Sequence, residues 1–175
     1  PKRTMDVHMA VDGANMTCSA CHRAEKHAIP GKSMGVSVGG GGQTLNCTDC
    51  HAGSPHGPND QLNRHAKKVA CQTCHIPTFA RTLPTKVWWD WSTAGKDGSV
   101  AKDQYGLPLY DKQKGDFRWA KDIKPTYMWF NGSVDRYLAG DKMDPAKVTH
   151  LNYPRGDRRD NTALITPFKV MQGKQ

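Results

Sequence analysis

The sequence predicts a mostly irregular fold, with short α-helices and little β-structure, that packs around bound groups more than around its own side chains. Composition is the first reason: only 37% of the 175 residues are hydrophobic, and 17 Gly and 11 Pro interrupt regular structure. The second reason is that all six cysteines fall into three C-x-x-C pairs, each followed directly by histidine. A chain with so little apolar material needs additional groups to complete a core.

The C-x-x-C pairs are compatible with three chemistries: disulfides, zinc ligation and covalent attachment of c-type haem. Zinc sites do not require the adjacent histidine, and a thioredoxin-like motif would need a βαβ pattern that the sequence lacks. With 8 histidines in 175 residues, chance puts histidine at three fixed positions in roughly one sequence in 10,000. We therefore predict three covalently bound c-type haems. The attachment residues are Cys18 and Cys21, Cys47 and Cys50, and Cys71 and Cys74.

The spacing of the motif follows from the haem itself. Two thiols three residues apart can add to the two vinyl groups on one edge of the porphyrin, and the next residue then brings its imidazole to the iron. The predicted proximal ligands are His22, His51 and His75. The fold class is thus a multihaem cytochrome c, in which the chain packs around a haem stack.

Five histidines remain for the distal positions of three irons. At two of the motifs, a second histidine follows the proximal histidine by five residues. Five extended residues span at most about 17 Å. That length is too short to pass around the rim of the same macrocycle, so these two histidines should bind a neighbouring haem. Hydrogen bonding to a propionate or the backbone is the alternative. The expected distal ligands are His8, His27, His56 and His65, while His150 is isolated in the tail.

The chain divides by composition into two segments. Residues 1–80 hold every cysteine and seven of the eight histidines, whereas all five tryptophans lie in residues 81–175. We predict a three-haem segment over 1–80 and a haem-free, Trp-rich wrapping segment of the same domain over 81–175. The "WWDW" stretch could pack against a haem or a neighbouring wall, or form a partner surface.

Few regular elements are expected. The best helical pattern covers residues 61–75, with Asn59 or Asp60 available as its N-cap. A flexible turn or hairpin is expected within the glycine-rich residues 35–44, and Asn131 with Gly132 should form a tight hairpin turn.

The formal net charge of +9 overstates the positive field. Two propionates against one net positive ferric centre per haem would lower the total to about +6. The basic side chains should pair with propionates or steer acidic redox partners. A nucleic-acid partner is not expected, because no basic run carries interleaved aromatic residues.

No stretch is long and apolar enough for a membrane span. Since covalent haem attachment takes place outside the cytoplasm and the chain opens at Pro1, as if a leader had been removed, a periplasmic or extracellular location is expected.

Three stretches carry a likeness to a known family: "LNRHAKKVACQTCHIPTFARTLPTKVWWDWSTAG", "NGSVDRYLAGDK" and "TPFKVMQGKQ". They resemble the octahaem tetrathionate reductase family of multihaem c-type cytochromes, most specifically from Asn63 to Gly95. The resemblance implies a portion or a shortened relative of a periplasmic eight-haem protein. Such proteins reduce tetrathionate, nitrite or hydroxylamine at one haem with a non-histidine distal ligand, reported as lysine. All three motifs here are the ordinary C-x-x-C-H, so the resemblance does not place that haem in this chain.

Three functions remain open from the sequence. The first is electron transfer through three closely packed, bis-histidine haems of low potential. The second is the electron-relay part of a multihaem oxidoreductase acting on tetrathionate, nitrite or hydroxylamine. The third is a subunit of a conductive extracellular filament. The expected partners are redox proteins or further haem-bearing segments of the same or a neighbouring chain, and an oligomer is compatible with each function.

Overall fold

The computed structural model describes residues 1–23, 45–51 and 53–174. The prediction for His27 and the turn predicted within 35–44 lie outside these residues. The chain forms two compact units: residues 1–73 with 128–166, and residues 74–127 with 167–175. The division predicted at residue 80 concerns haem content and stays a prediction. Among the described residues, no helix has the length and apolar character needed to cross a membrane.

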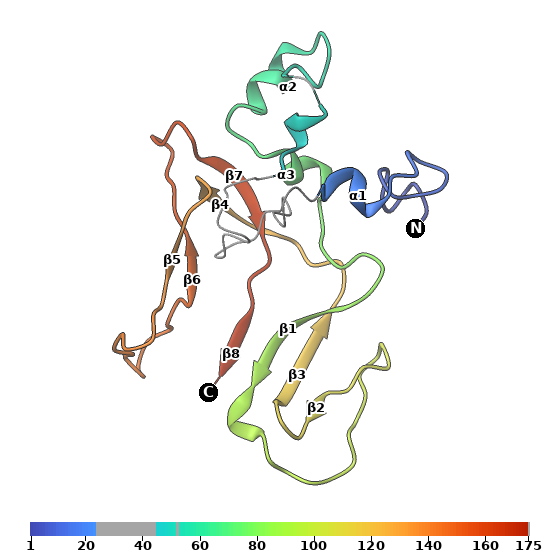
Figure 1. Cartoon of the computed structure of the whole chain (residues 1–175). Helices are drawn as coiled ribbons and strands as arrows, with labels where there is room; N and C mark the ends of the chain where they lie inside the picture. Colours follow the sequence, from blue (N-terminus) through green and yellow to red (C-terminus); the bar gives the residue numbers. More distant parts are fainter. Residues whose placement is uncertain (24–44, 52, 175) are drawn as a thin grey trace. The chain divides into compact units, whose positions relative to one another are not determined.

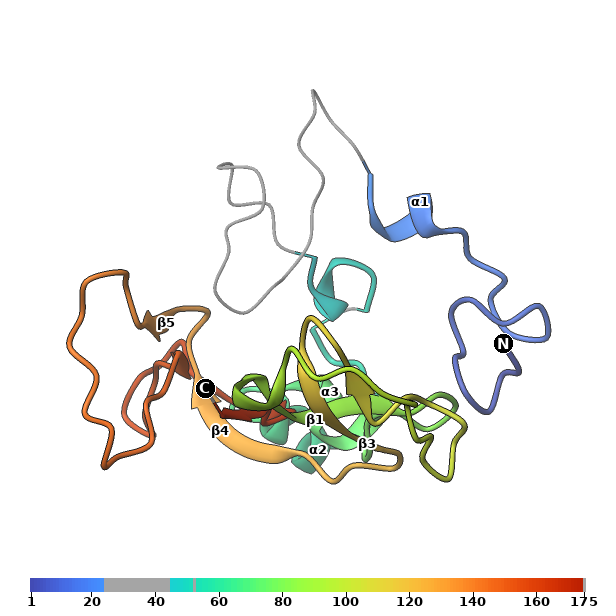
Figure 2. The same ribbon diagram turned by 90° about the horizontal axis from the view of Figure 1, so that it is seen from below.

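The helices of the first unit are all short, as predicted (Figure 1). Residues 1–16 form a series of turns, drawn in blue around the N label in Figures 1 and 2. The elements that follow are α1 (Cys18–Cys21), the 3-10 helix η1 (Cys47–Asp49), α2 (Asp60–His65) and α3 (Cys71–His75). The last of these begins in the first unit and ends in the second.

The helix predicted over 61–75 is interrupted in its middle. Its start is confirmed, because the Asn59 side chain caps α2 by accepting a hydrogen bond from the Leu62 N–H. The backbone then leaves the helix to pair with Ile165: the Ile165 N–H donates to the Lys68 carbonyl at 2.8 Å, and the Ala70 N–H donates to the Ile165 carbonyl at 2.9 Å. This pairing with a distant strand stops the helix between α2 and α3. The sequence pattern of residues 61–75 gives no sign of the pairing.

The strands that lie wholly or mostly in the first unit form two small sheets. One pairs β4 (Thr126–Phe130) with β7 (Leu164–Phe168), and the other pairs β5 (Val134–Arg136) antiparallel to β6 (Asn152–Pro154). The chain from β5 to β6 forms a long loop, drawn in orange in Figure 2.

The hairpin predicted at Asn131 and Gly132 is wrong, although the turn itself exists. Gly132 has φ +93°, and the Asn131 side-chain oxygen accepts hydrogen bonds from the Ser133 N–H and hydroxyl. The strands on either side, β4 and β5, pair with different later strands instead of with each other. The turn residues therefore predicted the change of direction correctly but not the pairing.

The second unit is built on a four-stranded sheet in the order β2–β3–β1–β8, seen in the lower part of Figure 1. β3 runs antiparallel to both β1 and β2, and β8 runs parallel to β1. The strands are more numerous than the sequence analysis expected. Their bounds, with that of the 3-10 helix η2, are β1 Thr85–Asp90, η2 Trp91–Thr93, β2 Tyr110–Asp111, β3 Gly115–Ala120 and β8 Gln172–Lys174.

The apolar core is thin, in agreement with the composition. Among the described residues, no large side chain is fully buried, and many large apolar side chains are exposed. A chain in which protein packing covers so little apolar surface is suited to packing around another apolar group. The buried apolar residues are Ala10, Ala70, Ala163 and Phe130 in the first unit and Phe117 in the second.

Candidate haem sites

The three C-x-x-C-H motifs all adopt a helical turn. The His22 N–H donates to the Cys18 carbonyl at 2.8 Å, and the His51 N–H donates to the Cys47 carbonyl at 2.9 Å. The third motif is helical throughout, because α3 includes all its residues from Cys71 to His75. Residues three and four positions apart lie on one face of a helix. The spacing of the motif is therefore compatible with two thiols and one imidazole on the same side of each turn.

Different local contacts hold the second and third turns. At η1, the Asn46 N–H donates to the Asp49 carboxylate at 2.8 Å, and the Asn46 side chain in turn accepts from the Asp49 N–H. This reciprocal pair satisfies backbone donors at the start of a very short helix. At α3, the Thr73 hydroxyl donates to the Ile165 carbonyl at 2.8 Å, which anchors the turn to β7.

The donor set of each turn fits a covalently attached haem. All six cysteines are described, none of them is in a disulfide, and each is exposed or half-buried. Two accessible thiols on one face can each form a thioether with a vinyl group, and the histidine that follows supplies a nitrogen ligand to iron. Within the described residues, no group of three or more His, Cys, Asp or Glu side chains is arranged to hold a bare metal ion.

The second and third sites lie side by side. The Gln72 side chain of α3 donates to the Cys47 sulfur of η1 across 3.8 Å. This contact places the second and third C-x-x-C-H turns next to each other. The close packing of haems stays a prediction.

Three of the predicted distal histidines are described, and they lie at different places in the first unit. The ring of His8, in the N-terminal turns, has its centroid 6.1 Å from that of His51 at an interplanar angle of 67°. His56 is half-buried, and its N–H donates to the Asn63 side chain at 3.1 Å, which ties the loop to α2. His65 ends α2 and is exposed. The structure thus brings one predicted distal ligand to a predicted proximal ligand.

His150 lies against the ring of Tyr153. It is exposed, and its ring centroid is 5.1 Å from that of Tyr153 in a T-shaped arrangement. This geometry is an ordinary edge-to-face aromatic contact.

The tryptophan cluster "WWDW" packs within the sheet of the second unit. Trp88 lies under the Arg118 guanidinium, 4.5 Å from the ring centroid, and the rings of Trp89 and Trp91 have centroids 6.2 Å apart. Trp89 also lies so close to Gly173 of β8 that a Cβ there would be 2.8 Å from the indole. Packing against a neighbouring wall, one of the alternatives raised by the sequence, is therefore found for these side chains.

A lysine beside this cluster has a perturbed pKa. The Lys86 ammonium lies 3.2 Å from the centroid of the Phe117 ring. Burial lowers the pKa of Lys86 below its usual value, and the positive charge of Lys114 lowers it further. The aromatic face stabilises the ammonium and so offsets part of that cost.

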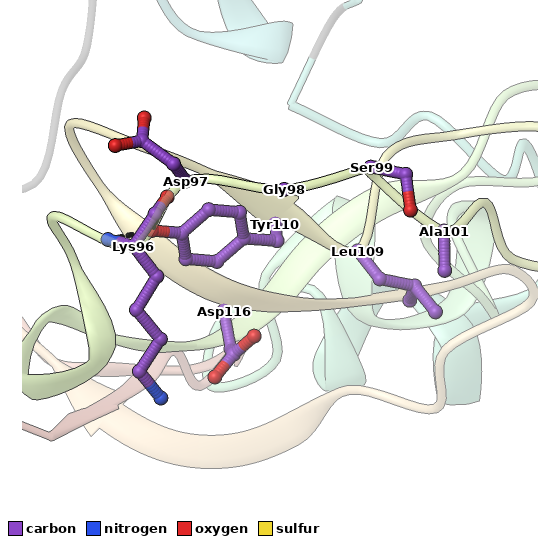
Figure 3. A pocket seen from close by; sticks show the side chains of 8 residues that line it. All are labelled: Lys96, Asp97, Gly98, Ser99, Ala101, Leu109, Tyr110 and Asp116. Atoms are coloured by element: carbon purple, nitrogen blue, oxygen red, sulfur yellow. Dashed lines mark hydrogen bonds between the residues drawn. The ribbon is translucent and has the colours of Figure 1, made fainter.

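The second unit also holds an open pocket of about 400 Å³ (Figure 3). Tyr110 lies across it, and its hydroxyl both accepts from the Lys96 N–H at 2.7 Å and donates to the Lys96 carbonyl at 2.9 Å. The sequence gives no sign of this pocket, because its residues follow no motif. None of its lining residues is a cysteine or a histidine. Its lining residues are Lys96, Asp97, Gly98, Ser99, Ala101, Leu109, Tyr110 and Asp116.

Comparison with known proteins gives two matches. Residues 86–175 match the model of the bacterial cytochrome c family. The crystal structure of octaheme cytochrome c from Shewanella oneidensis is similar over 99% of this chain, with 53% sequence identity and a TM-score of 0.87. This chain spans 39% of the length of that one. No curated protein matches the sequence.

Helical C-x-x-C-H turns together with this likeness define a multihaem cytochrome c. The chain belongs to the bacterial cytochrome c family. That assignment is independent of the haem motifs, because the matched residues begin after His75, where the last motif ends. The family implies covalently bound c-type haem and electron transport. The narrower resemblance to tetrathionate reductases stays a proposal.

Proposed function

We propose that this chain binds three c-type haems covalently and relays single electrons through them. The single observation that carries the proposal is that all three C-x-x-C-H motifs form helical turns with free thiols. A c-type haem bound there supplies reversible one-electron chemistry at its iron. The chain's own residues attach each haem by two cysteines and orient it by one histidine, so that each iron holds a fixed place in the relay.

The contact between the second and third turns favours a relay over three isolated sites. Gln72 and Cys47 are in direct contact, so these two attachment points cannot be far apart. The thin core and exposed apolar side chains give the haems protein surface to pack against. We expect distal ligation by His8, His27, His56 and His65 to make the haems six-coordinate and low in potential.

The relay is tested by counting electrons. Acid–acetone extraction of the purified protein should leave the haem on the polypeptide, because thioether bonds survive it. Reductive titration in a spectroelectrochemical cell should then take up three electrons per chain reversibly. Haem that extracts into the solvent, or uptake of fewer than three electrons, would contradict the proposal.

A second candidate is a relay segment within a larger reductase. The observation that favours it is the similarity to an octaheme cytochrome c, of which this chain spans 39%. In that case further haem-bearing segments, in the same or a neighbouring chain, accept or supply the electrons. Tetrathionate, nitrite and hydroxylamine are the substrates that the family resemblance implies.

Spectroscopy separates these two candidate functions, and electron microscopy tests the third, a conductive filament. If every haem is low-spin and the reduced protein does not bind CO, the three haems serve only as a relay. A high-spin haem that binds CO and is reoxidised by one of the three substrates would favour a reductase. Discrete particles in electron microscopy would exclude a conductive filament of this chain.

We further propose a periplasmic or extracellular location, where covalent haem attachment takes place. Expression with an export leader and the haem-attachment machinery should give red holoprotein. Expression of the same sequence without a leader should give haem-free thiols, which a thiol-alkylation assay would count. Full haem loading in the cytoplasm would contradict the location.

A further inference from the structure

Within the described part of the chain, the rings of His8 and His51 pair a predicted distal ligand with a predicted proximal ligand. His51 follows Cys50 directly, so the attachment chemistry assigns it to the iron of the second haem. His8 lies in the N-terminal turns before the first motif. The pair therefore connects a segment at the start of the chain to the second haem site and bypasses the first.

The separation of the two rings matches that of two imidazoles on opposite sides of one metal ion. A metal–nitrogen bond to histidine is about 2 Å long and the ring centre lies about 1 Å beyond the nitrogen, so two such rings have centroids about 6 Å apart. The observed separation is 6.1 Å. The interplanar angle of 67° is also compatible with two imidazoles on one metal ion, because each ring can rotate about its bond to the metal without changing that separation.

The backbone around His8 is held firmly enough to position a ligand. The Asp6 carboxylate accepts from the N–H groups of His8 at 2.9 Å and of Met9 at 3.1 Å, and the His8 carbonyl accepts from the Met16 N–H at 2.8 Å. The next turn is tight, because a Cβ on Gly13 would come within 2.5 Å of the Val7 carbonyl. These contacts fix the main chain on both sides of the imidazole, which reduces the entropy cost of ligation.

The alternative to ligation of a shared iron is an ordinary edge-to-face contact. Aromatic pairs commonly have ring centroids roughly 4.5 to 7 Å apart, and the His8–His51 separation falls within that range. Both rings are exposed to solvent, where such a contact between imidazoles contributes little stability by itself. The identity of the partner decides between the readings. His8 pairs with a histidine that the C-x-x-C-H motif already assigns to an iron, whereas His150 pairs with a tyrosine.

We propose that His8 is the distal ligand of the haem attached at Cys47 and Cys50, opposite His51. This inference rests on the proposed function, because it requires a haem at that site. The ligation closes residues 8–51 into a loop that contains the first attachment turn. The first and third irons are then left with His27, His56 and His65 as their distal candidates.

The test compares His8→Ala with His150→Ala in the full haem-loaded chain. Both histidines are exposed and in T-shaped ring pairs, so the second variant is a matched control. His8→Ala should keep the parent's haem content, because the thioethers are untouched, but convert one haem to a high-spin form that binds CO when reduced. His150→Ala should match the parent. If His8→Ala leaves every haem low-spin in electron paramagnetic resonance, the proposal is wrong.

Two further variants make the assignment specific. His8→Met restores a sixth ligand, and a Met/His iron has a higher potential than a bis-histidine one. One haem should therefore return to low spin with its potential raised. In a chain that lacks the second haem through C47A and C50A, adding His8→Ala should change no remaining haem. A change there would mean that His8 ligates another iron, which would overturn the proposal.

These outcomes are distinguishable from failure of the proposed function. If the parent protein carries no haem at the second turn, its haem count is low before any histidine is changed, and the relay proposal fails with it. If the parent carries all three haems and His8→Ala has no spectroscopic effect, only the ligand assignment fails.

Discussion

Single carboxylates fix several loops of this chain, and Asp160 is the clearest case. Its side chain accepts from the Thr162 hydroxyl at 2.7 Å, from the Asn131 amide at 2.8 Å and from the Thr162 N–H at 2.8 Å. These donors lower the pKa of Asp160 from 3.8 to about 2, because each stabilises the charged form. The contact with Asn131 ties the chain before β7 to the end of β4.

Asp160→Asn should destabilise the first unit at neutral pH, because an amide cannot accept from all three donors. The folded-state pKa is depressed, so the stabilisation is fully present above the ordinary value of 3.8 and is lost as the pH falls to about 2. The difference in melting temperature between variant and parent, followed by circular dichroism, should therefore shrink over that interval. The control Asp97→Asn, whose side chain is 85% exposed, should differ little from the parent at any pH. A difference for Asp160→Asn that is constant with pH would contradict this account.

The candidate haem sites rest on the most local pattern in the sequence. C-x-x-C-H is a local pattern, so its helical turns and the sequence order of thiols and imidazole follow from five adjacent residues. The partner of His8 cannot be found in this way. Its proximity to His51 depends on the fold of the N-terminal turns, and slack in the chain allowed His8 to reach any of the three irons.

At the scale of elements, the sheet of the second unit depends on one glycine at the start of β3. Gly115 has φ +76°, and a Cβ there would lie 1.9 Å from the Asp90 carbonyl of β1. Only glycine permits both the left-handed conformation and the close approach of the two strands. The strands can pair to their ends because this position has no side chain.

Gly115→Ala should lower the stability of this sheet substantially, and Gly106→Ala should lower it much less. Gly106 has nearly the same φ, +77°, but a Cβ there meets nothing within 4 Å. The control therefore carries only the cost of the left-handed conformation, about 1 kcal/mol, whereas Gly115→Ala adds a steric clash with the β1 backbone. Chemical denaturation of both variants measures the difference. Equal losses would show that the close contact with Asp90 has no energetic weight.

The helix α2 depends on its N-cap. Asn59→Ala should cost about 1 kcal/mol of folding free energy, because the Leu62 N–H loses its acceptor, while Asn59→Asp should keep most of it. Urea denaturation of the two variants measures the free energy of unfolding. The Asn59 contribution would be refuted if the alanine and aspartate variants unfolded at the same midpoint.

The sequence predicted the starts and turns of elements better than their extents. Asn59 was correctly expected to begin a helix, and the turn at Asn131 and Gly132 exists. The helix stops early because residues 68–70 pair with Ile165, and the hairpin fails because β4 and β5 pair with later strands. Caps and turns are determined by neighbouring residues, whereas strand pairing is determined by residues far along the chain.

At the scale of the whole molecule, composition predicted a thin protein core correctly, and it placed the aromatic residues in a segment with no haem motif. It did not predict that all the strands of the described residues lie in this segment. Trp88, Trp89 and Phe117 pack within the sheet of the second unit and across its strands. Family membership is carried by residues 86–175, which have no C-x-x-C-H motif.

We claim that each of the three turns carries one covalently bound haem. Intact mass spectrometry of the purified holoprotein should therefore give the mass of the polypeptide plus three haems, with no cysteine open to alkylation. Cys18→Ala with Cys21→Ala, or the equivalent change at either other turn, should remove one haem mass and leave two. A parent protein that carries fewer than three haems, or whose six cysteines are all open to alkylation, would contradict the claim.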